Sequence, residues 1–286
     1  MNETLAIIIL NYFGHEDTLA CVASVRCCVE EVVLFIVDNS SDIEEETRLR
    51  ELFEGTPDVR LLFPGSNLGF SAGVNWGLSR AMSEGYNRFL LLNNDAVLLD
   101  GAGAILQAAS AEHRGALLAP TIRWAGQVCA GNYYHRYFGL INRKRPRFHS
   151  GWVFYLTGCG LLFDRVFLEQ NGPFNEAFFM YGEDVEFCSR AYGNGLPVMC
   201  LPDVIIDHAG SGSARMASFF YEYHVVRSHY LLTFILLPHP LQRLVSLAGK
   251  FLCLMLRALV RCLRFKTAAP LKALCLAPIK LPVRPP

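Results

Sequence analysis

The stretch Leu5-Ala6-Ile7-Ile8-Ile9-Leu10, followed directly by Asn11, is the segment of the sequence that decides the fold. An unbroken, isoleucine-rich apolar run of this length is typical of a strand that is buried on both faces of a parallel sheet. Because the run stops at a polar side chain, we expect the carboxyl end of this strand at Asn11.

Working outward from this strand, the next residues alternate between helix and strand patterns. The expected helices cover residues 18–29, 43–54 and 72–84, and the expected strands cover residues 32–37, 59–63 and 88–92. With right-handed crossovers, this alternation predicts an α/β fold with an open, mostly parallel sheet and helices on both faces. Beyond residue 100 the alternation decays, and the aromatic, glycine-rich and basic stretch 132–147 is expected to form loops and irregular strands lining a second half-site.

Length and charge bound the organisation of the chain. Its 286 residues can bury a large core, and one main domain is the simplest arrangement. All 26 acidic residues lie at or before Glu222, and 10 of the 26 Lys and Arg residues follow it. This asymmetry indicates a basic appendage suited to an anionic surface. We therefore expect a main domain over residues 1–230 and a helical C-terminal region over residues 231–286.

The ten cysteines are scattered, and no pair has the C-x-x-C spacing of a zinc or redox site. We expect them to be small buried apolar side chains in a reducing compartment. The start of the chain lacks a basic segment, and residues 5–10 are too short for a signal peptide. The main domain is therefore expected in the cytoplasm, and no nucleic-acid partner is expected.

Polar residues follow three of the expected strands, at the edge where open α/β sheets bind ligands. Asn11 ends the first, Asp38 the second, and Asn93-Asn94-Asp95 follow the fourth. A carboxylate at Asp38 can accept hydrogen bonds from a base or ribose, and the alternative is a loop that caps the next helix. Asp95 suits a divalent cation, Mg²⁺ or Mn²⁺, that holds a diphosphate, and the alternative is an Asx turn.

A run of small residues, Asn67-Leu68-Gly69-Phe70-Ser71-Ala72-Gly73-Val74-Asn75, lies at a loop-to-helix junction. Backbone N–H groups exposed there can face an anion or a flat ring. The run is neither G-x-G-x-x-G nor a P-loop, and the first strand-helix turn contains only Gly14. These absences argue against a dehydrogenase and against an NTPase that cradles phosphates.

Glu183 and Asp184 are adjacent carboxylates at an expected helix start, directly after the aromatic stretch 178–181. A carboxyl beside apolar rings can have its pKa moved toward the working range of a general base. The alternative is that acids favour helix N-termini because of the macrodipole. His208 follows the apolar-rich stretch 198–206, and it can ligate a metal, bind phosphate or simply be a hydrogen-bonded loop residue.

Taken in order, these segments resemble the family 2 glycosyltransferases with the GT-A fold, and most closely their rhamnosyltransferase-like branch, which assembles bacterial surface polysaccharides. The resemblance spans about residues 4–230. Five motifs in family order make it specific: Val37 to Ser41, Asn67 to Asn75, Leu91 to Asp95, Thr157-Gly158, and Gly172 to Glu176 leading to Gly182-Glu183-Asp184.

The resemblance implies an inverting enzyme that moves a sugar from a dTDP-, UDP- or GDP-sugar to a hydroxyl of a glycan or lipid-linked acceptor. It implies that Asp38 binds the donor's base, that Asp95 binds the metal and the donor ribose-phosphate, and that Asp184 is the catalytic base. His208 would complete the metal or diphosphate site, and Glu183 would lie on the acceptor side. Asn93 stands where the family's D-x-D motif has its first acid. The expected donor-binding residues are Asn11, Asp38, Asn67, Gly69, Asn75 and Asn93.

Two other functions remain to be weighed. A catalytically inactive nucleotide-sugar-binding protein of the same fold would not need both Asp95 and Asp184, so their presence argues against it. A nucleotidyltransferase would need a glycine-rich loop with Lys or Arg after the first strand, and residues 11–15 do not supply one.

The C-terminal region carries a basic stripe on an otherwise apolar helix, expected over residues 244–264. Four cations, Arg243, Lys250, Arg257 and Arg264, recur every seven residues, and Arg261 follows Arg257 by four. Seven residues are nearly two helical turns, so these cations share one face. They interrupt any run of about eighteen apolar residues, so a membrane-spanning helix is not expected. We expect instead a helix that lies in the interface of an anionic membrane, at the inner face of the cell membrane. The alternative is a buried helix whose basic ends reach water. The stripe consists of Arg243, Lys250, Arg257, Arg261 and Arg264, and residues 278–286 resemble a frayed, proline-rich tail.

Overall fold

The first expected strand, β1 (Asn2–Asn11), pairs in parallel with β2 (Val32–Asp38) on one side and with β4 (Tyr86–Asn93) on the other. In this register Asn11 lies opposite Asp38, and Leu10 lies opposite Asn93. The polar residues at the three strand ends therefore meet at one edge of the sheet, as the sequence predicts.

The computed structural model describes residues 2–124, 126–147, 150–208 and 217–280. These residues form a nine-stranded sheet in the order β3-β2-β1-β4-β11-β6-β12-β5, with β7 paired to β6. The first four strands are parallel, β11 runs antiparallel to both neighbours, and β5 runs antiparallel to β12. The expected α/β fold with a mostly parallel sheet is confirmed. The remaining strands are β3 (Val59–Leu62), β5 (Ala96–Leu98), β6 (Leu117–Trp124), β7 (Gln127–Cys129), β11 (Gly160–Asp164) and β12 (Val198–His208).

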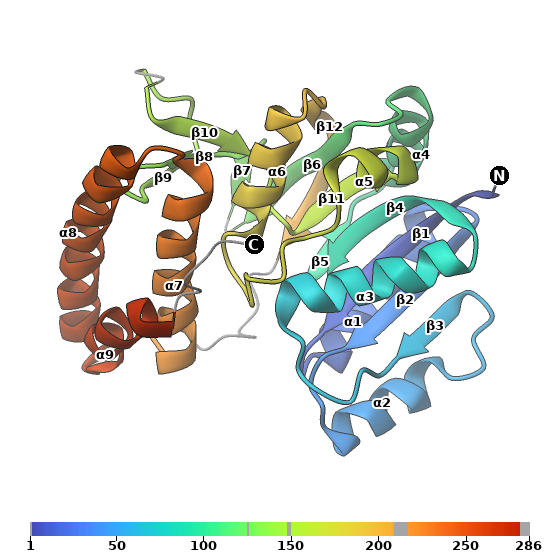
Figure 1. Ribbon diagram of the computed structural model, residues 1–286. Helices are drawn as coiled ribbons and strands as arrows, with labels where there is room; N and C mark the ends of the chain where they lie inside the picture. The colour runs from blue at the N-terminus through green and yellow to red at the C-terminus, as the bar shows by residue number, and fades with distance from the viewer. Residues whose placement is uncertain (1, 125, 148–149, 209–216, 281–286) are drawn as a thin grey trace.

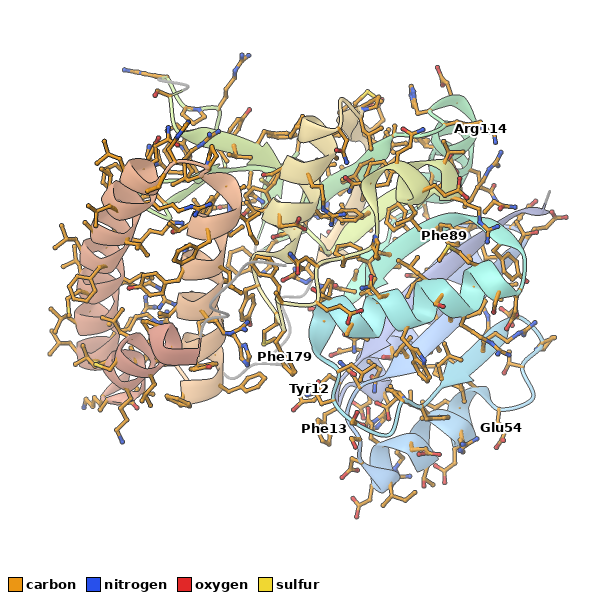
Figure 2. The ribbon with its side chains drawn as sticks, in the orientation of Figure 1. Tyr12, Phe13, Glu54, Phe89, Arg114 and Phe179 are labelled. Carbon is orange, nitrogen blue, oxygen red and sulfur yellow. The ribbon has the colours of Figure 1, made fainter. Side chains whose placement is uncertain are left out.

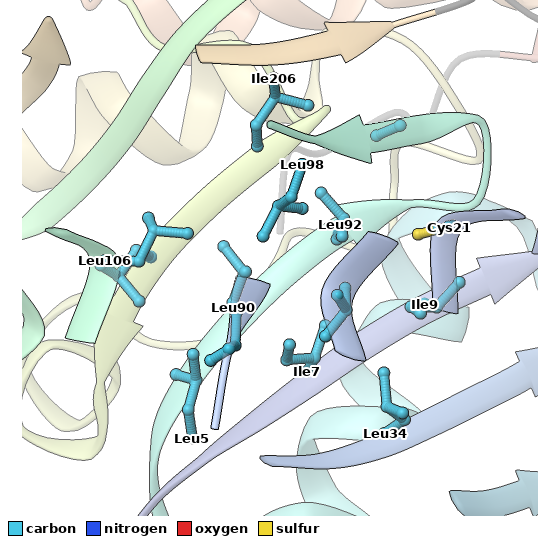
Figure 3. Packing of buried hydrophobic residues seen from close by; sticks show 14 of the residues in the cluster. Leu5, Ile7, Ile9, Cys21, Leu34, Leu90, Leu92, Leu98, Leu106 and Ile206 are labelled. Atoms are coloured by element: carbon cyan, nitrogen blue, oxygen red, sulfur yellow. The ribbon is translucent and has the colours of Figure 1, made fainter. Parts of the chain in front are cut away.

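Helices cover both faces of this sheet (Figure 1). One face packs against α1 (His15–Cys28), α2 (Ile43–Phe53) and α4 (Ala102–Glu112). The other packs against α3 (Gly69–Ser83), α5 (Arg165–Asn171) and α6 (Glu183–Gly193). Successive side chains of β1 alternate between these two cores, so Ile7 and Ile9 enter the first (Figure 3) and Ile8 the second. The unbroken apolar run is explained by burial on both faces.

The stretch 132–147, expected to form loops and irregular strands, supplies two strands of a small antiparallel sheet in the order β10-β8-β9. Its strands are β8 (Asn132–His135), β9 (Ile141–Asn142) and β10 (Trp152–Tyr155). All ten cysteines are free, and the expectation that they are buried holds fully for Cys21, Cys159 and Cys188, whereas Cys27 and Cys275 are exposed.

A helical layer lies at one side of the molecule (Figure 1). It consists of α7 (Phe219–Leu236), α8 (Pro240–Phe265), α9 (Ala269–Leu276) and the short 3₁₀ helix 277–280. The expected boundary after residue 230 falls inside α7, so the layer begins at Phe219. No helix among the described residues has the length and apolar character needed to cross a membrane. Most of the expected proline-rich tail, residues 281–286, lies outside the described residues.

The basic stripe of α8 faces α7, so most of its cations are not available to bind an anionic membrane. Arg257 and Arg261 bind the two carboxylate oxygens of Glu222 at 2.5 and 2.6 Å, and Glu222 is fully buried. Lys250 is also fully buried, and its ammonium group donates to the carbonyl of His229 at 2.8 Å.

The first cation of the stripe, Arg243, likewise turns inward and donates to the carbonyl of Leu237 at 2.7 Å. Only Arg264 of the stripe is exposed. The physical reason is that a buried acid and helix carbonyls on α7 offer these cations partners, which the spacing along α8 alone does not reveal.

Candidate active site

The Asn93-Asn94-Asp95 segment leads from β4 into β5, and β5 pairs with β12 so that Ala96 lies opposite His208. This pairing brings His208 beside Asp95, with its Nε2 atom 3.1 Å from the Asp95 Oδ1 atom. The Asn93 side-chain amide lies 3.5 Å from the same nitrogen. Three residues predicted from two motifs far apart in the sequence are thus brought together at the end of the sheet.

Asp95 and His208 can supply two ligands to one cation. Asp95 is buried, and its carboxylate and the imidazole are close enough to share a metal ion. Among the described residues, no group of three or more His, Cys, Asp or Glu side chains could hold a metal. A cation here would need further oxygen ligands, and a diphosphate provides them. The residues therefore fit a metal that is completed by its substrate.

Asn11 and Asp38 lie in a buried hydrogen-bonded network at the same edge. The Asn11 amide donates to Asp38 Oδ1 at 3.0 Å and to Glu45 Oε1 at 2.9 Å. The second oxygen of Asp38 accepts from the Ser40 hydroxyl at 2.8 Å. The strand-end carboxylate is thereby held in place by neutral donors.

Glu45 belongs to this network but escaped the sequence analysis. Its carboxylate also contacts His15 Nδ1 at 2.7 Å. Burial raises the pKa of Glu45, but the hydrogen bonds from Asn11 and His15 outweigh it and lower the pKa below its usual value. In the sequence Glu45 is one of three consecutive acids after the N-cap Asp42. That pattern is already explained by the helix dipole, so it gave no functional signal.

The glycine-rich junction is fastened to the end of β2 by Asn39, which the sequence analysis did not single out. Its amide donates to the Gly69 carbonyl at 2.8 Å, and its oxygen accepts from the Leu68 N–H at 2.9 Å. Asn67 caps its own turn by accepting from the Gly69 N–H at 2.9 Å. These contacts hold the loop at the ligand-binding edge.

Asn75 is placed differently from the other expected donor-binding residues. Its side chain exchanges two hydrogen bonds of 2.9 Å with the backbone of Phe174 and donates a third to Glu176 at 2.9 Å. Asn75 thus ties α3 to the segment that precedes α6. Its structural contribution is to position that segment.

Gly69 allows the glycine-rich junction to touch the residues before α6. Its φ angle is +79°, and an added Cβ would lie 2.5 Å from the Phe179 carbonyl oxygen. The same oxygen accepts from the Phe70 N–H at 2.6 Å. A side chain at position 69 would be strained and would separate the two segments.

Glu183 and Asp184 begin α6, where Glu183 is buried and Asp184 is partly buried. Asp184 accepts hydrogen bonds from the backbone N–H groups of Val185, at 2.8 Å, and Gly158. Burial nevertheless raises the pKa of Asp184. The pKa of Glu183 is raised by burial and by the neighbouring Asp184 charge, and its Oε2 atom has no hydrogen-bond partner. Raised pKa values set this pair apart from acids that merely begin a helix.

Two adjacent residues connect this carboxylate pair to the end of β4. Gly158 donates its backbone N–H to Asp184, and the carbonyl of Cys159 accepts from the Asn93 N–H at 3.0 Å. Gly158 and Cys159 therefore link the end of β4, which leads to Asp95, with the carboxylate pair at the start of α6. The residues predicted for the donor side and for the acceptor side are thus connected through one short segment.

A mostly parallel sheet whose strand ends are polar, joined to a carboxylate pair on a following helix, is typical of transferases of the GT-A fold. The chain belongs to glycosyl transferase family 2, whose model matches residues 6–172. The expected family and fold are thus confirmed.

A curated relative is the low-salt glycan biosynthesis hexosyltransferase Agl10 of Haloferax volcanii. It is 30% identical over 200 residues, which cover 67% of this chain and 62% of that protein. The match therefore spans less than two thirds of the relative's length.

Solved structures share the fold at low identity. GalNAc-T7 with UDP, GalNAc and Mn²⁺ superposes with a TM-score of 0.61 at 15% identity, covering 79% of this chain and 47% of that chain. The mannosyltransferase PcManGT of Pyrobaculum calidifontis with GDP-Man and Mn²⁺ gives 0.54 at 14% identity, covering 96% and 75%. S. aureus TarS with UDP gives 0.53 at 16% identity, covering 86% and 70%.

Proposed function

We propose that the chain is a nucleotide-sugar-dependent glycosyltransferase that inverts the anomeric carbon in one displacement. The observation that carries this proposal is that adjacent residues reach the two halves of the site: Gly158 donates to Asp184, and Cys159 accepts from Asn93 at the end of β4. A transfer of this kind needs a base near the acceptor hydroxyl and a charged site near the leaving group. Neighbouring residues of one segment support both.

Asp184 is the proposed base. It takes the proton of the acceptor hydroxyl as the oxygen attacks the anomeric carbon, whose bond to the nucleoside diphosphate breaks. Its raised pKa makes the carboxylate a stronger proton acceptor, and the N–H groups of Val185 and Gly158 fix its direction. Glu183, adjacent and buried, is proposed to contact the acceptor.

The donor is proposed to lie along the ends of β1, β2 and β4. The buried Asn11–Asp38–Glu45 network faces the base and ribose, while Asn67 and Gly69 shape the adjoining loop. Asp95, His208 and Asn93 would hold a divalent cation and the diphosphate, and a bound cation would stabilise the negative charge of the leaving group. We propose Mn²⁺ over Mg²⁺, because an imidazole ligand favours a transition-metal ion.

The sugar is proposed to be a hexose or the deoxyhexose rhamnose, and the acceptor a glycan or a lipid-linked glycan. Hexose is supported by the name of the Haloferax relative, and rhamnose by the resemblance of the sequence motifs to the rhamnosyltransferase-like branch. UDP, GDP and dTDP remain the candidate nucleotides.

A panel of UDP-, GDP- and dTDP-sugars, including dTDP-rhamnose, tests the proposal. Release of nucleoside diphosphate would be measured with Mn²⁺, with Mg²⁺ and with chelator. We expect turnover with one nucleotide class, dependence on the cation and a product of inverted configuration by NMR. Binding without release from any donor would favour the inactive nucleotide-sugar-binding protein. A product of retained configuration would refute the single displacement.

A further inference from the structure

The outward side of α8 is apolar. Figure 1 places α8 at the outer edge of the helical layer, and Figure 2 shows no other described element over its outward side chains. Five leucines on this side are between 64% and 82% exposed, and we call them the leucine face: Leu241, Leu244, Leu252, Leu256 and Leu263. Their spacing places them on one stripe of the helix.

α8 is thus inverted relative to a surface helix of a water-soluble protein, which buries its apolar stripe and exposes its charges. Here the buried side carries Lys250, Arg257 and Arg261, which bind α7. Only a few apolar residues of α8, including Leu254 and Ala258, join the third hydrophobic cluster. The leucine face contributes nothing to folding until something apolar covers it.

We propose that the leucine face inserts into the surface of an anionic lipid bilayer, with α8 lying in the plane of the membrane. The 26 residues of α8 extend over about 39 Å at 1.5 Å per residue, which suits a helix that lies flat. The apolar side chains enter the acyl-chain boundary, and no part of the chain needs to cross it. This inference stands independently of the transfer reaction.

Charge decides between lipid and a second copy of the chain. Arg264, Lys266 and Lys272 are exposed in the layer, and no acid follows Glu222 in the sequence. Two leucine faces pressed together would bring two such cationic layers together without counter-charges. Lipid phosphates and acidic headgroups supply the counter-charges that the sequence after Glu222 lacks.

The test is vesicle co-sedimentation of the full chain with phosphatidylcholine vesicles and with vesicles containing phosphatidylglycerol. The variant L252E/L256E changes two leucines of the face, and Ile43→Glu is the matched control, because Ile43 is an exposed apolar residue on α2. We expect the parent and the control to bind the anionic vesicles and the double variant to bind at least about tenfold more weakly. Because these positions are exposed, circular dichroism and the melting temperature should remain unchanged.

Charge and oligomeric state give two further readouts. The variant R264Q/K266Q/K272Q should lose most of the preference for anionic over neutral vesicles. Equal vesicle binding by the parent and by L252E/L256E would overturn the proposal. A dimer in light scattering that dissociates in L252E/L256E, with no vesicle binding by the parent, would overturn it in favour of a second copy.

Discussion

The start of α6 and the interior of the helical layer both bury carboxylates, but they surround them with different partners. Glu222 is fully buried between two arginines. Asp184 is held by backbone N–H groups, and Glu183 keeps one oxygen without a partner.

This difference separates structural from reactive carboxylates. Two guanidinium groups compensate the charge of a buried carboxylate, and the three side chains together form a structural ion-pair network. A carboxylate that is shielded from water and has no cation beside it has a raised pKa, so it can accept a proton more readily. Burial is common to both regions, so the nature of the partner decides the chemistry.

The largest expected effect is the loss of the arginine partners of Glu222. We expect R257L/R261L to lower the free energy of unfolding by about 3–5 kcal/mol, because it leaves a buried charge without compensation. Urea denaturation measures this change. Arg264→Leu, at an exposed position of the same stripe, should change stability by less than about 0.5 kcal/mol. E222L/R257L/R261L should recover most of the loss, and a triple variant as unstable as the double one would refute the explanation.

The next effect concerns the base. Asp184→Asn keeps the shape of the side chain but cannot accept the proton, so we expect turnover to fall by at least about a hundredfold. Nucleotide-sugar affinity, measured by calorimetry, should stay within about twofold, because Asp184 is proposed to contact the acceptor and not the nucleotide. A larger loss of turnover in Glu183→Gln than in Asp184→Asn would assign the base to Glu183 instead.

A smaller effect is expected at the end of the sheet. Asp95→Ala removes the anionic ligand of the proposed cation and should weaken donor binding by about tenfold to a hundredfold. His208→Ala should have a lesser effect in the same direction. Calorimetry with and without Mn²⁺ should show cation-dependent affinity in the parent and none in Asp95→Ala. Unchanged affinity in both conditions would exclude the metal role.

The smallest effect is a pH-dependent gain of stability. Because the pKa of Glu183 is raised in the folded protein, its stabilising contribution is present below its usual pKa and is lost as the pH rises through the raised value. Glu183→Gln should therefore melt at a higher temperature than the parent at about pH 8, by a few degrees, and at nearly the same temperature at about pH 4. An equal difference at both pH values would mean that Glu183 is not buried as a titrating acid.

The residues at the carboxyl edge of the sheet could be predicted because the direction and end of each strand fix where its last residue lies. An apolar parallel strand that ends at Asn11, Asp38 or Asn93 must place that residue at the carboxyl edge of the sheet. The helices between the strands were predicted from the same alternation of helix and strand patterns. Helical periodicity gave the spacing of the α8 cations but not the side that faces the protein. That direction depends on Glu222, which lies on another helix, 35 residues before Arg257.

Other residues escaped prediction because their roles arise from tertiary neighbours. Glu45 differs from Glu44 and Glu46 only in that Asn11 and His15 lie within hydrogen-bond distance of it. Asn39 follows Asp38, which drew the prediction, and the role of Asn39 depends on its hydrogen bond to the carbonyl of Gly69, thirty residues later. No local pattern distinguishes such residues from loop and helix-end neighbours.

Because of the position of α7, the helical layer packs against and supports α6, the helix that carries the proposed base. Leu231 and Leu232 of α7 belong to the core beneath α6, whereas Val226 and Tyr230 belong to the cluster shared with α8 and α9. A Cβ added to Gly182, the residue that caps α6, would lie only 3.0 Å from the Ser228 Cβ atom of α7.

Loss of α7 packing would therefore expose Gly182, the residue that precedes the carboxylate pair. Loss of α8 would leave Glu222 without Arg257 and Arg261. The two parts should unfold as one cooperative unit, with the amide hydrogens of α6 and α7 exchanging at similar free energies of opening. A chain cut between α7 and α8 would then fail as an isolated transferase through loss of rigidity at its base, even though every proposed catalytic residue precedes the cut.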